Sequence, residues 1–200
     1  MKQVKLAIIY YSSYGTNYQM ATWAKEAAEA EGAEVRLLQV AELAPQSVID
    51  NQPAWKANQE ATKHIPFASA ADLDWADSYL FSMPTRFGNV PSQMKQFLDI
   101  QGELWSKGAL ANKIVGAMSS AQNDNGGQEA TILSLFTTMY HWGAIVVTPG
   151  YLNNASSKVG GNPYGTSITV DPKGNVVEGA QEAVAAQTKR QLEVTKQYIS

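Results

Sequence analysis

The sequence contains no cysteine, and histidine occurs only at His64 and His141. Without cysteine the chain has no disulfide, no thiolate nucleophile and no zinc–thiolate site. Two histidines are too few for a His-rich metal centre, so we predict no metal site. We assign His64 no role because it lies in an irregular stretch.

Charged residues are also sparse. They make up 16% of the 200 residues, against about 25% in a typical soluble domain, and the formal net charge is −3. Lys and Arg form no run, and nucleic-acid binding needs clustered cations, so that class of function is excluded. Low charge leaves more surface that subunits can bury, which favours an oligomer. A monomer with an amide-rich surface stays the alternative.

Long apolar runs are absent as well. The longest, at residues 6–11, is far too short to cross a bilayer. The amino terminus has neither the charged opening nor the small-residue cleavage site of a signal peptide. With a hydrophobic share of 44%, the composition is that of a folded protein. We therefore expect a cytoplasmic protein with no integral membrane segment.

The sequence does contain a regular alternation of apolar runs and amphipathic stretches. Strands are predicted at residues 4–11, 35–40, 78–83, 114–118 and 144–147. Helices are predicted at residues 17–31, 90–98, 128–141 and 179–198. Strands that alternate with helices form a parallel sheet through crossover connections. We therefore predict a single α/β domain over residues 1–200, flavodoxin-like, with a doubly wound five-stranded parallel sheet and helices on both faces.

Two stretches interrupt this alternation. Residues 41–68 contain Pro45, Pro53 and Pro66 and show no sustained period, and residues 150–178 are rich in Gly, Asn and Pro. Loops of this length inside a domain are usually functional, interfacial or disordered. We predict both stretches as elaborated loops.

Ligands of open α/β sheets bind beyond the carboxyl ends of the strands, so the segments that follow the strands are the candidate binding residues. The first strand is followed by a loop that turns through glycine into a helix: Ser12, Ser13, Tyr14, Gly15, Thr16 and Asn17. Its hydroxyls and the free N–H groups of the helix start can hold a phosphate. An ordinary turn with a helix cap is the alternative. Neither GxGxxG nor GxxxxGK[ST] occurs, which argues against a dinucleotide fold and a P-loop.

The loops after the third and fourth strands offer hydrogen-bonding groups for a flat ring. The third strand is followed by Pro84, Thr85, Arg86, Phe87, Gly88 and Asn89. The fourth is followed by Ser119, Ser120, Ala121, Gln122, Asn123 and Asp124. Each loop alone is also compatible with a plain turn or a solvated connection. Three such loops at one edge indicate a phosphate beside a polar heterocycle, and flavin mononucleotide (FMN) fits best.

Six segments together resemble one protein family. They are SSYG (12–15), PTRFGN (84–89), QMKQFLD (93–99), LW (104–105), GGQE (126–129) and GGNPYG (160–165). These segments resemble the WrbA family of NAD(P)H:quinone oxidoreductases. The resemblance implies a flavodoxin-like homotetramer that binds FMN, takes two electrons from NADH or NADPH and passes them to quinones. It also implies that residues 12–17 bind the FMN phosphate and that residues 85–89 and 119–124 flank the isoalloxazine ring.

The resemblance supplies three candidate catalytic residues. Tyr14 and Trp105 match positions that line the nicotinamide and quinone pocket, and we expect both beside the three loops. His141 matches a histidine that reaches the flavin site across a subunit boundary. We expect a ping-pong cycle at one flavin face, with each substrate in turn stacking on Trp105. Tyr14 or His141 would steady a quinone oxygen or deliver a proton.

The chain departs from the family at two places. Residues 121–125 replace a glycine-rich loop, and the Asp124 carboxylate near the flavin would oppose an anionic hydroquinone. His141 is followed by Trp142 where the family often has a second histidine, so either residue is a candidate for the ring contact. Two other functions stay open, an electron-carrying flavodoxin and a regulatory protein of the kind that the family's historical link to the tryptophan repressor suggests. The charge of −3 is mild for an electron carrier.

Overall fold

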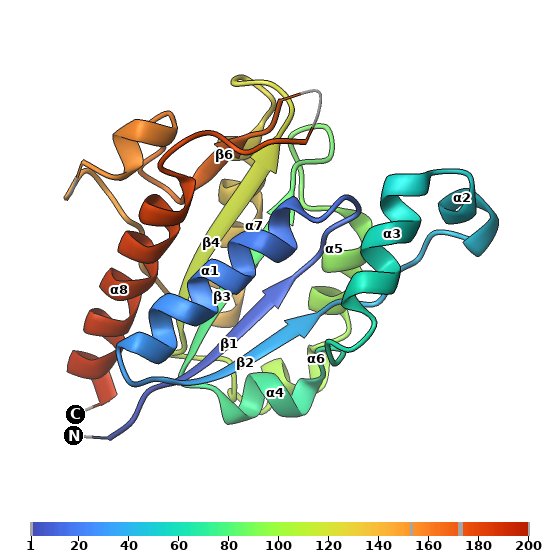
Figure 1. Ribbon diagram of the computed structural model, residues 1–200. Helices are drawn as coiled ribbons and strands as arrows, with labels where there is room; N and C mark the ends of the chain where they lie inside the picture. Colours follow the sequence, from blue (N-terminus) through green and yellow to red (C-terminus); the bar gives the residue numbers. More distant parts are fainter. Residues whose placement is uncertain (1, 153, 172–173, 200) are drawn as a thin grey trace.

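The computed structural model describes residues 2–152, 154–171 and 174–199, so small parts of the predicted loop 150–178 lie outside the described residues. Its centre is a parallel sheet with the strand order β2-β1-β3-β4-β5 (Figure 1). The strands are β1 (Lys5–Tyr10), β2 (Glu34–Gln39), β3 (Ser78–Pro84), β4 (Ile114–Ala121) and β5 (Ile145–Val146). The predicted doubly wound sheet is therefore confirmed.

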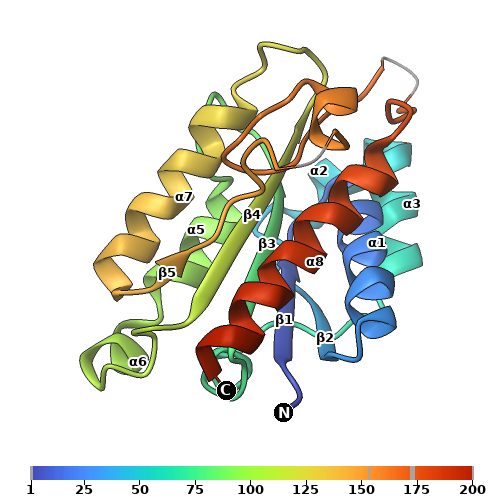
Figure 2. The same cartoon turned by 90° about the vertical axis from the view of Figure 1, so that its left-hand side faces the viewer.

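Helices cover both faces of the sheet, as Figure 2 shows. One layer consists of α1 (Thr16–Ala30) and α8 (Ala180–Ile199), and the other of α4 (Ala70–Trp75), α5 (Ser92–Asp99) and α7 (Gln128–Trp142). Side chains alternate along a strand, so Ile8 packs in the first layer and Ile9 in the second. The four helices predicted from apolar spacing are confirmed, with small shifts at their ends.

The edge of the sheet beside β4 is shared by two short strands. The first two residues of β4 pair with β5, and its last three residues pair in parallel with β6 (Ser167–Thr169). The elaborated loop predicted over residues 150–178 therefore contains two elements that were not predicted, β6 and the 3₁₀ helix η1 (Ser156–Val159). A three-residue strand is too short to show an alternating pattern. With β6 as its partner, β4 also continues to Ala121, beyond the predicted end at residue 118.

The stretch 41–68 is largely helical, so the prediction of an irregular loop there is wrong. It holds α2 (Gln46–Asp50) and α3 (Pro53–Thr62), and Pro53 takes the first helical position, which proline tolerates. The only buried residue of α3 is Thr62, so this helix has no apolar stripe for a pattern to detect. A further short helix, α6 (Gly102–Ser106), precedes β4.

Both ends of the described chain lie at the amino-terminal side of the sheet (Figure 1). No helix within the described residues is long and apolar enough to cross a membrane. Across the same residues, no three His, Asp or Glu side chains are placed to hold a metal ion.

Candidate active site

The loop between β1 and α1 leaves hydrogen-bond donors free at the start of a helix. It lies at the carboxyl end of β1, which has β2 on one side and β3 on the other, so the strand order reverses there. Gly15 precedes the helix with a φ of 97°, and its N–H donates to Ser12 Oγ at 3.0 Å. No side chain caps α1, and its first N–H groups, at residues 16–18, have no acceptor in the described part of the chain. Free N–H groups at a helix start bind phosphate without a cation.

Two of the predicted phosphate ligands point their side chains inward. Asn17 is 1% exposed; its Nδ2 donates to Ser120 Oγ at 2.7 Å, and its Oδ1 accepts from Ser82 Oγ at 3.2 Å. Ser13 is 2% exposed, and its hydroxyl accepts a hydrogen bond from Arg86 Nη2 at 2.9 Å. These side chains fix the loop against β3 and β4. The prediction that the Ser13 hydroxyl holds phosphate is therefore not supported.

The hydroxyls left for a phosphate are those of Ser12 and Thr16. Both residues are half-buried, and neither hydroxyl donates to an acceptor among the described residues. Tyr14, between them in sequence, is 54% exposed. The loop therefore offers two hydroxyl donors and a run of N–H groups on one side of an exposed aromatic ring.

The loop after β3 is a tight turn with an aromatic tip. Arg86 and Asn89 exchange two backbone hydrogen bonds of 3.0 Å, and Phe87 and Gly88 between them have φ values of 53° and 76°. Positive φ at both central residues is the geometry of a type I′ turn, which a phenylalanine adopts only at a cost in energy. The Phe87 side chain is fully exposed. Strain that holds an apolar ring in solvent is a feature of binding sites rather than of folding cores.

The loops after β3 and β4 pack directly on each other. Thr85 N–H donates to the Ser120 carbonyl at 2.9 Å, and Thr131 Oγ1 donates to Thr85 Oγ1 at 2.8 Å. A Cβ at Gly127 would lie 2.8 Å from Gly88 Cα, so only glycine allows this approach. This packing is consistent with the prediction that the loops after the third and fourth strands lie at one edge of the sheet.

Within the second of these loops, burial separates structural residues from available ones. Ser119 is fully buried and Ser120 is 4% exposed, because both belong to β4. Their placement as loop residues that face a ligand is therefore not supported. Gln122, Asn123 and Asp124 are exposed, and Ala121 is half-buried. The part of this loop that is accessible to a ligand therefore begins at Ala121.

Helix α3 adds residues that the sequence analysis missed. Asn58 Nδ2 donates to the Ser12 carbonyl at 2.9 Å, and the Trp55 ring meets the Tyr14 ring edge-on with centroids 6.1 Å apart. Gln52, just before α3, holds the Tyr14 hydroxyl by a hydrogen bond. The one signal in the sequence was a tryptophan in an otherwise polar stretch.

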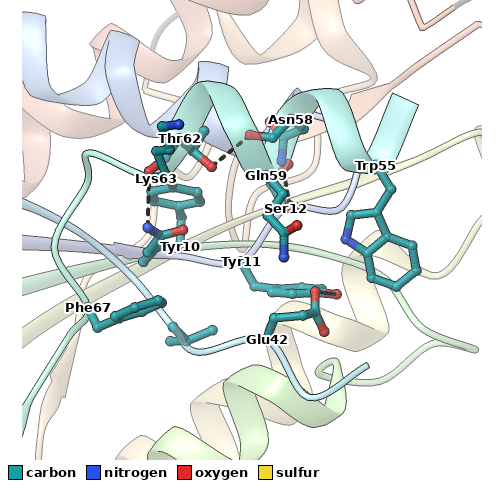
Figure 3. A pocket seen from close by; sticks show the side chains of 12 residues that line it. Tyr10, Tyr11, Ser12, Glu42, Trp55, Asn58, Gln59, Thr62, Lys63 and Phe67 are labelled. Atoms are coloured by element: carbon teal, nitrogen blue, oxygen red, sulfur yellow. Dashed lines mark hydrogen bonds between the residues drawn. The ribbon is translucent and has the colours of Figure 1, made fainter. Parts of the chain in front are cut away.

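A cavity of about 240 Å³ lies between α3 and the carboxyl ends of β1 and β2. In Figure 3, Trp55 and Asn58 extend from α3, while Tyr11 and Glu42 lie on the opposite wall. Ser12 lines the cavity too. The cavity therefore reaches Ser12, the first residue of the loop that was predicted to hold a phosphate (residues 12–17).

Trp105 and His141 lie together but away from these loops. Trp105 Nε1 donates to the His141 carbonyl at 2.9 Å, and both side chains are exposed. Helix α7 starts beside the loops at Gln128 and carries His141 about 20 Å away, at 1.5 Å per residue. Figure 2 shows α6 and the end of α7 at the opposite end of the sheet. The expectation that Trp105 stands beside the three loops is wrong within one chain.

Comparison with known proteins agrees with the loop geometry. The family model described as NADPH-dependent FMN reductase matches residues 4–158. A protein of Deinococcus radiodurans named NAD(P)H dehydrogenase (quinone) is 54% identical over 196 residues, covering 98% of each chain. One of the same name from Geotalea daltonii is 39% identical over 188 residues, covering 92% of this chain and 91% of its own. These matches include all three loops.

A solved structure shows the same fold. The flavodoxin, WrbA-like protein from Agrobacterium tumefaciens aligns with a TM-score of 0.68 over 98% of this chain and 99% of its own, at 21% sequence identity. The flavodoxin-like architecture is thereby confirmed, and the resemblance carried by the sequence motifs agrees with the named relatives. This chain belongs to the NADPH-dependent FMN reductase family, and its relatives include the bacterial proteins named NAD(P)H dehydrogenase (quinone).

Proposed function

We propose that this chain is an FMN-dependent oxidoreductase that passes two electrons from NADH or NADPH to quinones. The observation that carries the proposal is the start of α1, where N–H groups that have no acceptor among the described residues lie beside two packed loops, at the point where the strand order reverses. The names of relatives at 54% and 39% identity supply the donor and the quinone. Residues 1–200 act as one FMN-binding domain.

The residues present fit FMN at both of its ends. The N–H groups of residues 16–18 and the hydroxyls of Ser12 and Thr16 would hold the phosphate, and the Asn17 side chain would keep that loop in place. The turn from Thr85 to Asn89 and the exposed residues 121–124 would flank the ring. Bound FMN supplies the hydride chemistry, and the protein supplies binding and orientation.

Tyr14 is the candidate for contact with both substrates. Its ring is half exposed beside the phosphate loop, and Gln52 and Trp55 fix its position. A fixed phenol can steady a quinone oxygen by a hydrogen bond or deliver the proton that quinone reduction requires. We expect the two substrates to bind in turn beside Tyr14, at one face of the flavin, in a ping-pong cycle.

We also propose that the protein is a homotetramer of the cytoplasm in which a second copy completes each site. Trp105 and His141 do not reach the loops of their own chain, so only another subunit can bring them there. The surface around them is rich in exposed apolar side chains, with Ile100 at 71%, Trp105 at 56% and Tyr140 at 63%. Patches of this kind mark protein–protein contacts.

The activity is tested with FMN-loaded protein freed of unbound flavin. NADH and NADPH oxidation is followed without oxygen, in the presence and absence of benzoquinone. We expect rapid turnover only when quinone is present. Tightly bound FMN without NAD(P)H oxidation would contradict the reductase function and support an electron carrier.

The shared site is tested by complementation. Trp105→Ala is expected to raise the KM for NADH or quinone about fivefold while FMN stays bound, because an aromatic contact contributes on the order of 1 kcal/mol. Tyr14→Ala is expected to impair the same step from the other side. Coexpressed Trp105→Ala and Tyr14→Ala chains should regain activity, since some sites then combine both intact residues. Mixed oligomers no more active than the two variants would contradict a site shared between copies.

A further inference from the structure

Four side chains form a continuous chain of hydrogen bonds from the loop after β3 to the segment after β2. Arg86 Nη2 donates to Ser13 Oγ at 2.9 Å. Ser13 Oγ lies 3.2 Å from the Tyr11 hydroxyl, which donates to Glu42 Oε2 at 2.9 Å. These hydrogen bonds therefore link three segments that are far apart in the sequence, at the end of the sheet that holds the candidate FMN site.

The number of protons available shows which group donates in each of these hydrogen bonds. The Tyr11 hydroxyl has one proton and gives it to the Glu42 carboxylate, which is a stronger acceptor than a neutral hydroxyl. Burial raises the pKa of Tyr11, so the phenol keeps that proton. Ser13 must then donate to the Tyr11 oxygen and accept from Arg86. All the donors point from the guanidinium toward the carboxylate, an arrangement in which each bond strengthens the next.

Glu42 lies at one end of this series of hydrogen bonds, and several donors fix its position. Its Oε1 accepts the backbone N–H groups of Leu43 at 2.8 Å and Ala44 at 2.9 Å. The same oxygen accepts from Gln93 Nε2 in α5 at 2.6 Å. With the Tyr11 bond, the carboxylate has four donors from three elements, so its position is set by the fold. Glu42 lies in the stretch 41–68, to which the sequence analysis assigned no role.

Arg86 lies at the other end of this series of hydrogen bonds, and most of its N–H groups are available. Its second hydrogen bond goes to the carbonyl of its own neighbour, Thr85, at 3.1 Å. A guanidinium has five N–H groups, so three of them have no acceptor in the described part of the protein. Within the described residues no carboxylate forms an ion pair with Arg86. A half-buried cation with three free donors is suited to an anionic ligand.

We propose that Glu42 is a positioning residue for FMN: through Tyr11 and Ser13 it holds the Arg86 guanidinium against the phosphate loop, where its free N–H groups serve the cofactor. The inference rests on the proposed binding of FMN at this site. Reduced FMN carries more negative charge than oxidised FMN. A fixed guanidinium therefore favours the reduced form, because preorganised charge needs no rearrangement when the new charge appears.

Direct electrostatics predicts the opposite effect of removing the Glu42 charge. An isolated carboxylate near FMN disfavours the reduced form, so neutralising it would tighten the binding of reduced FMN. If Glu42 acts by positioning Arg86, its loss instead weakens that binding. The sign of the change therefore distinguishes the two roles.

The test is a double-mutant cycle on the midpoint potential of bound FMN, measured in wild type, Glu42→Gln, Arg86→Gln and the double variant. We expect Glu42→Gln to weaken the binding of reduced FMN relative to oxidised FMN about tenfold, a midpoint about 30 mV lower for a two-electron couple. In the Arg86→Gln background the same change should be less than twofold, because the group that Glu42 positions is gone. Glu60→Gln is the matched control, since it neutralises an exposed carboxylate of α3 and should leave the potential unchanged.

An equal effect of Glu42→Gln in both backgrounds, or a raised midpoint, would overturn the proposal. If Glu42→Gln does not fold, Tyr11→Phe interrupts the chain without changing any charge, and it should lower the midpoint in the same direction. An unchanged potential in folded Tyr11→Phe would overturn the proposal as well. Wild-type protein that binds no FMN would instead refute the proposed function, and the potential itself requires no NAD(P)H turnover.

Discussion

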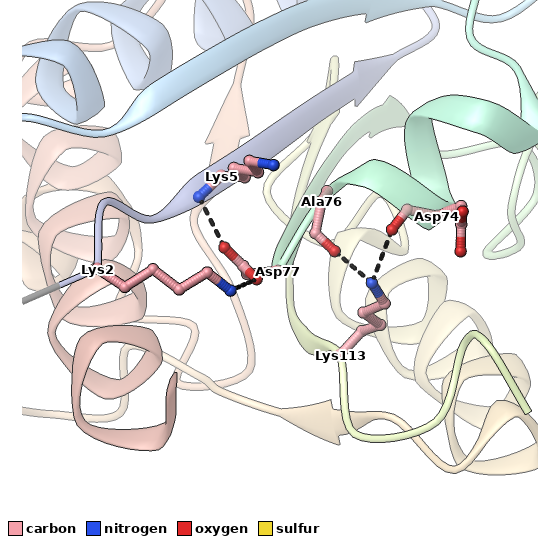
Figure 4. Close-up of polar contacts among 6 residues, drawn as sticks. All are labelled: Lys2, Lys5, Asp74, Ala76, Asp77 and Lys113. Carbon is pink, nitrogen blue, oxygen red and sulfur yellow. Dashed lines mark hydrogen bonds and ion pairs between the residues drawn. The ribbon is translucent and has the colours of Figure 1, made fainter. Parts of the chain in front are cut away.

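The two ends of the sheet are built from the same strands, but they differ in whether their polar groups have hydrogen-bond partners within the protein. At the amino end, the Asp77 carboxylate accepts hydrogen bonds from Lys2 Nζ at 2.9 Å and from the Lys5 backbone N–H at 3.0 Å (Figure 4). Lys113 Nζ donates to the carbonyls of Asp74 and Ala76. At the carboxyl end, the first N–H groups of α1 and three N–H groups of Arg86 have no acceptor among the described residues.

This difference separates folding from binding. Burial lowers the pKa of Lys113, yet the backbone carbonyls around it still satisfy the ammonium group. An end that only closes the fold satisfies its polar groups internally, because an unpaired buried group costs about 1–3 kcal/mol. An end that binds a ligand keeps donors free for it. Substitutions at the two ends should therefore have different consequences for stability and for FMN affinity.

The largest expected effect on stability comes from replacing a glycine at the carboxyl end, compared with a second glycine that also has a positive φ. Gly127→Ala at the carboxyl end should cost about 3 kcal/mol of folding free energy and reduce FMN affinity, because its Cβ would meet Gly88 Cα at 2.8 Å in addition to the positive φ of 94°. Gly108→Ala, beyond α6, has a φ of 69° and no atom within 4 Å of the new Cβ. It should cost about 1 kcal/mol and leave FMN affinity unchanged. Urea unfolding and FMN titration measure both; equal losses of FMN affinity would break the comparison.

A smaller effect is expected from Asp77→Ala at the amino end. The variant leaves the Lys5 N–H and Lys2 without their acceptor and should lower the free energy of unfolding by about 1.5 kcal/mol. FMN affinity should stay within twofold of wild type, since the change lies at the far end of the strands. A large drop in affinity without global unfolding would show that the two ends are coupled.

The smallest effect concerns alkaline stability. Tyr79 is fully buried and donates to the Leu73 carbonyl at 2.7 Å, and burial raises the pKa of its phenol. Above pH 10 the phenol ionises in the unfolded chain but not in the folded one, so the unfolded state binds fewer protons and stability falls as pH rises. Tyr79→Phe should cost about 1 kcal/mol at neutral pH. It should also make the decline above pH 10 shallower by about 1.4 kcal/mol per pH unit.

Tyr198→Phe is the control for that measurement, because Tyr198 lies on α8, away from the proposed subunit contact, and is 50% exposed. Its unfolding curves from pH 8 to 11 should follow those of wild type. A Tyr79→Phe curve parallel to wild type above pH 10 would contradict the assignment of Tyr79 to the closed core.

Local sequence patterns predicted the parts of the fold whose apolar content is periodic. The apolar run at residues 6–11 marked β1, and regular apolar spacing marked α1 and α7. The patterns failed for α3, which buries only Thr62, and for β6, whose three residues depend on pairing with the end of β4. Such elements are stabilised by tertiary contacts rather than by their own pattern.

The candidate site was predicted in location but not in the roles of its residues. The three loops followed from their places after β1, β3 and β4. Which side chains face a ligand did not, because Ser13 and Asn17 point inward only through partners such as Arg86 and Ser120. The distance of Trp105 from the loops depends on the path of α6 and α7, which no local motif encodes.

Hydrogen–deuterium exchange with and without FMN tests most directly that the carboxyl end of the sheet is the binding end. We expect FMN to slow exchange at residues 13–18, 85–89 and 121–127, which include the two packed loops and the N–H groups of α1 that have no partner within residues 2–152, 154–171 and 174–199. Exchange at residues 74–77 and 113–114, where the polar groups are already paired, should not change. Protection at the amino end, or no protection at the three loops in protein saturated with FMN, would contradict this account.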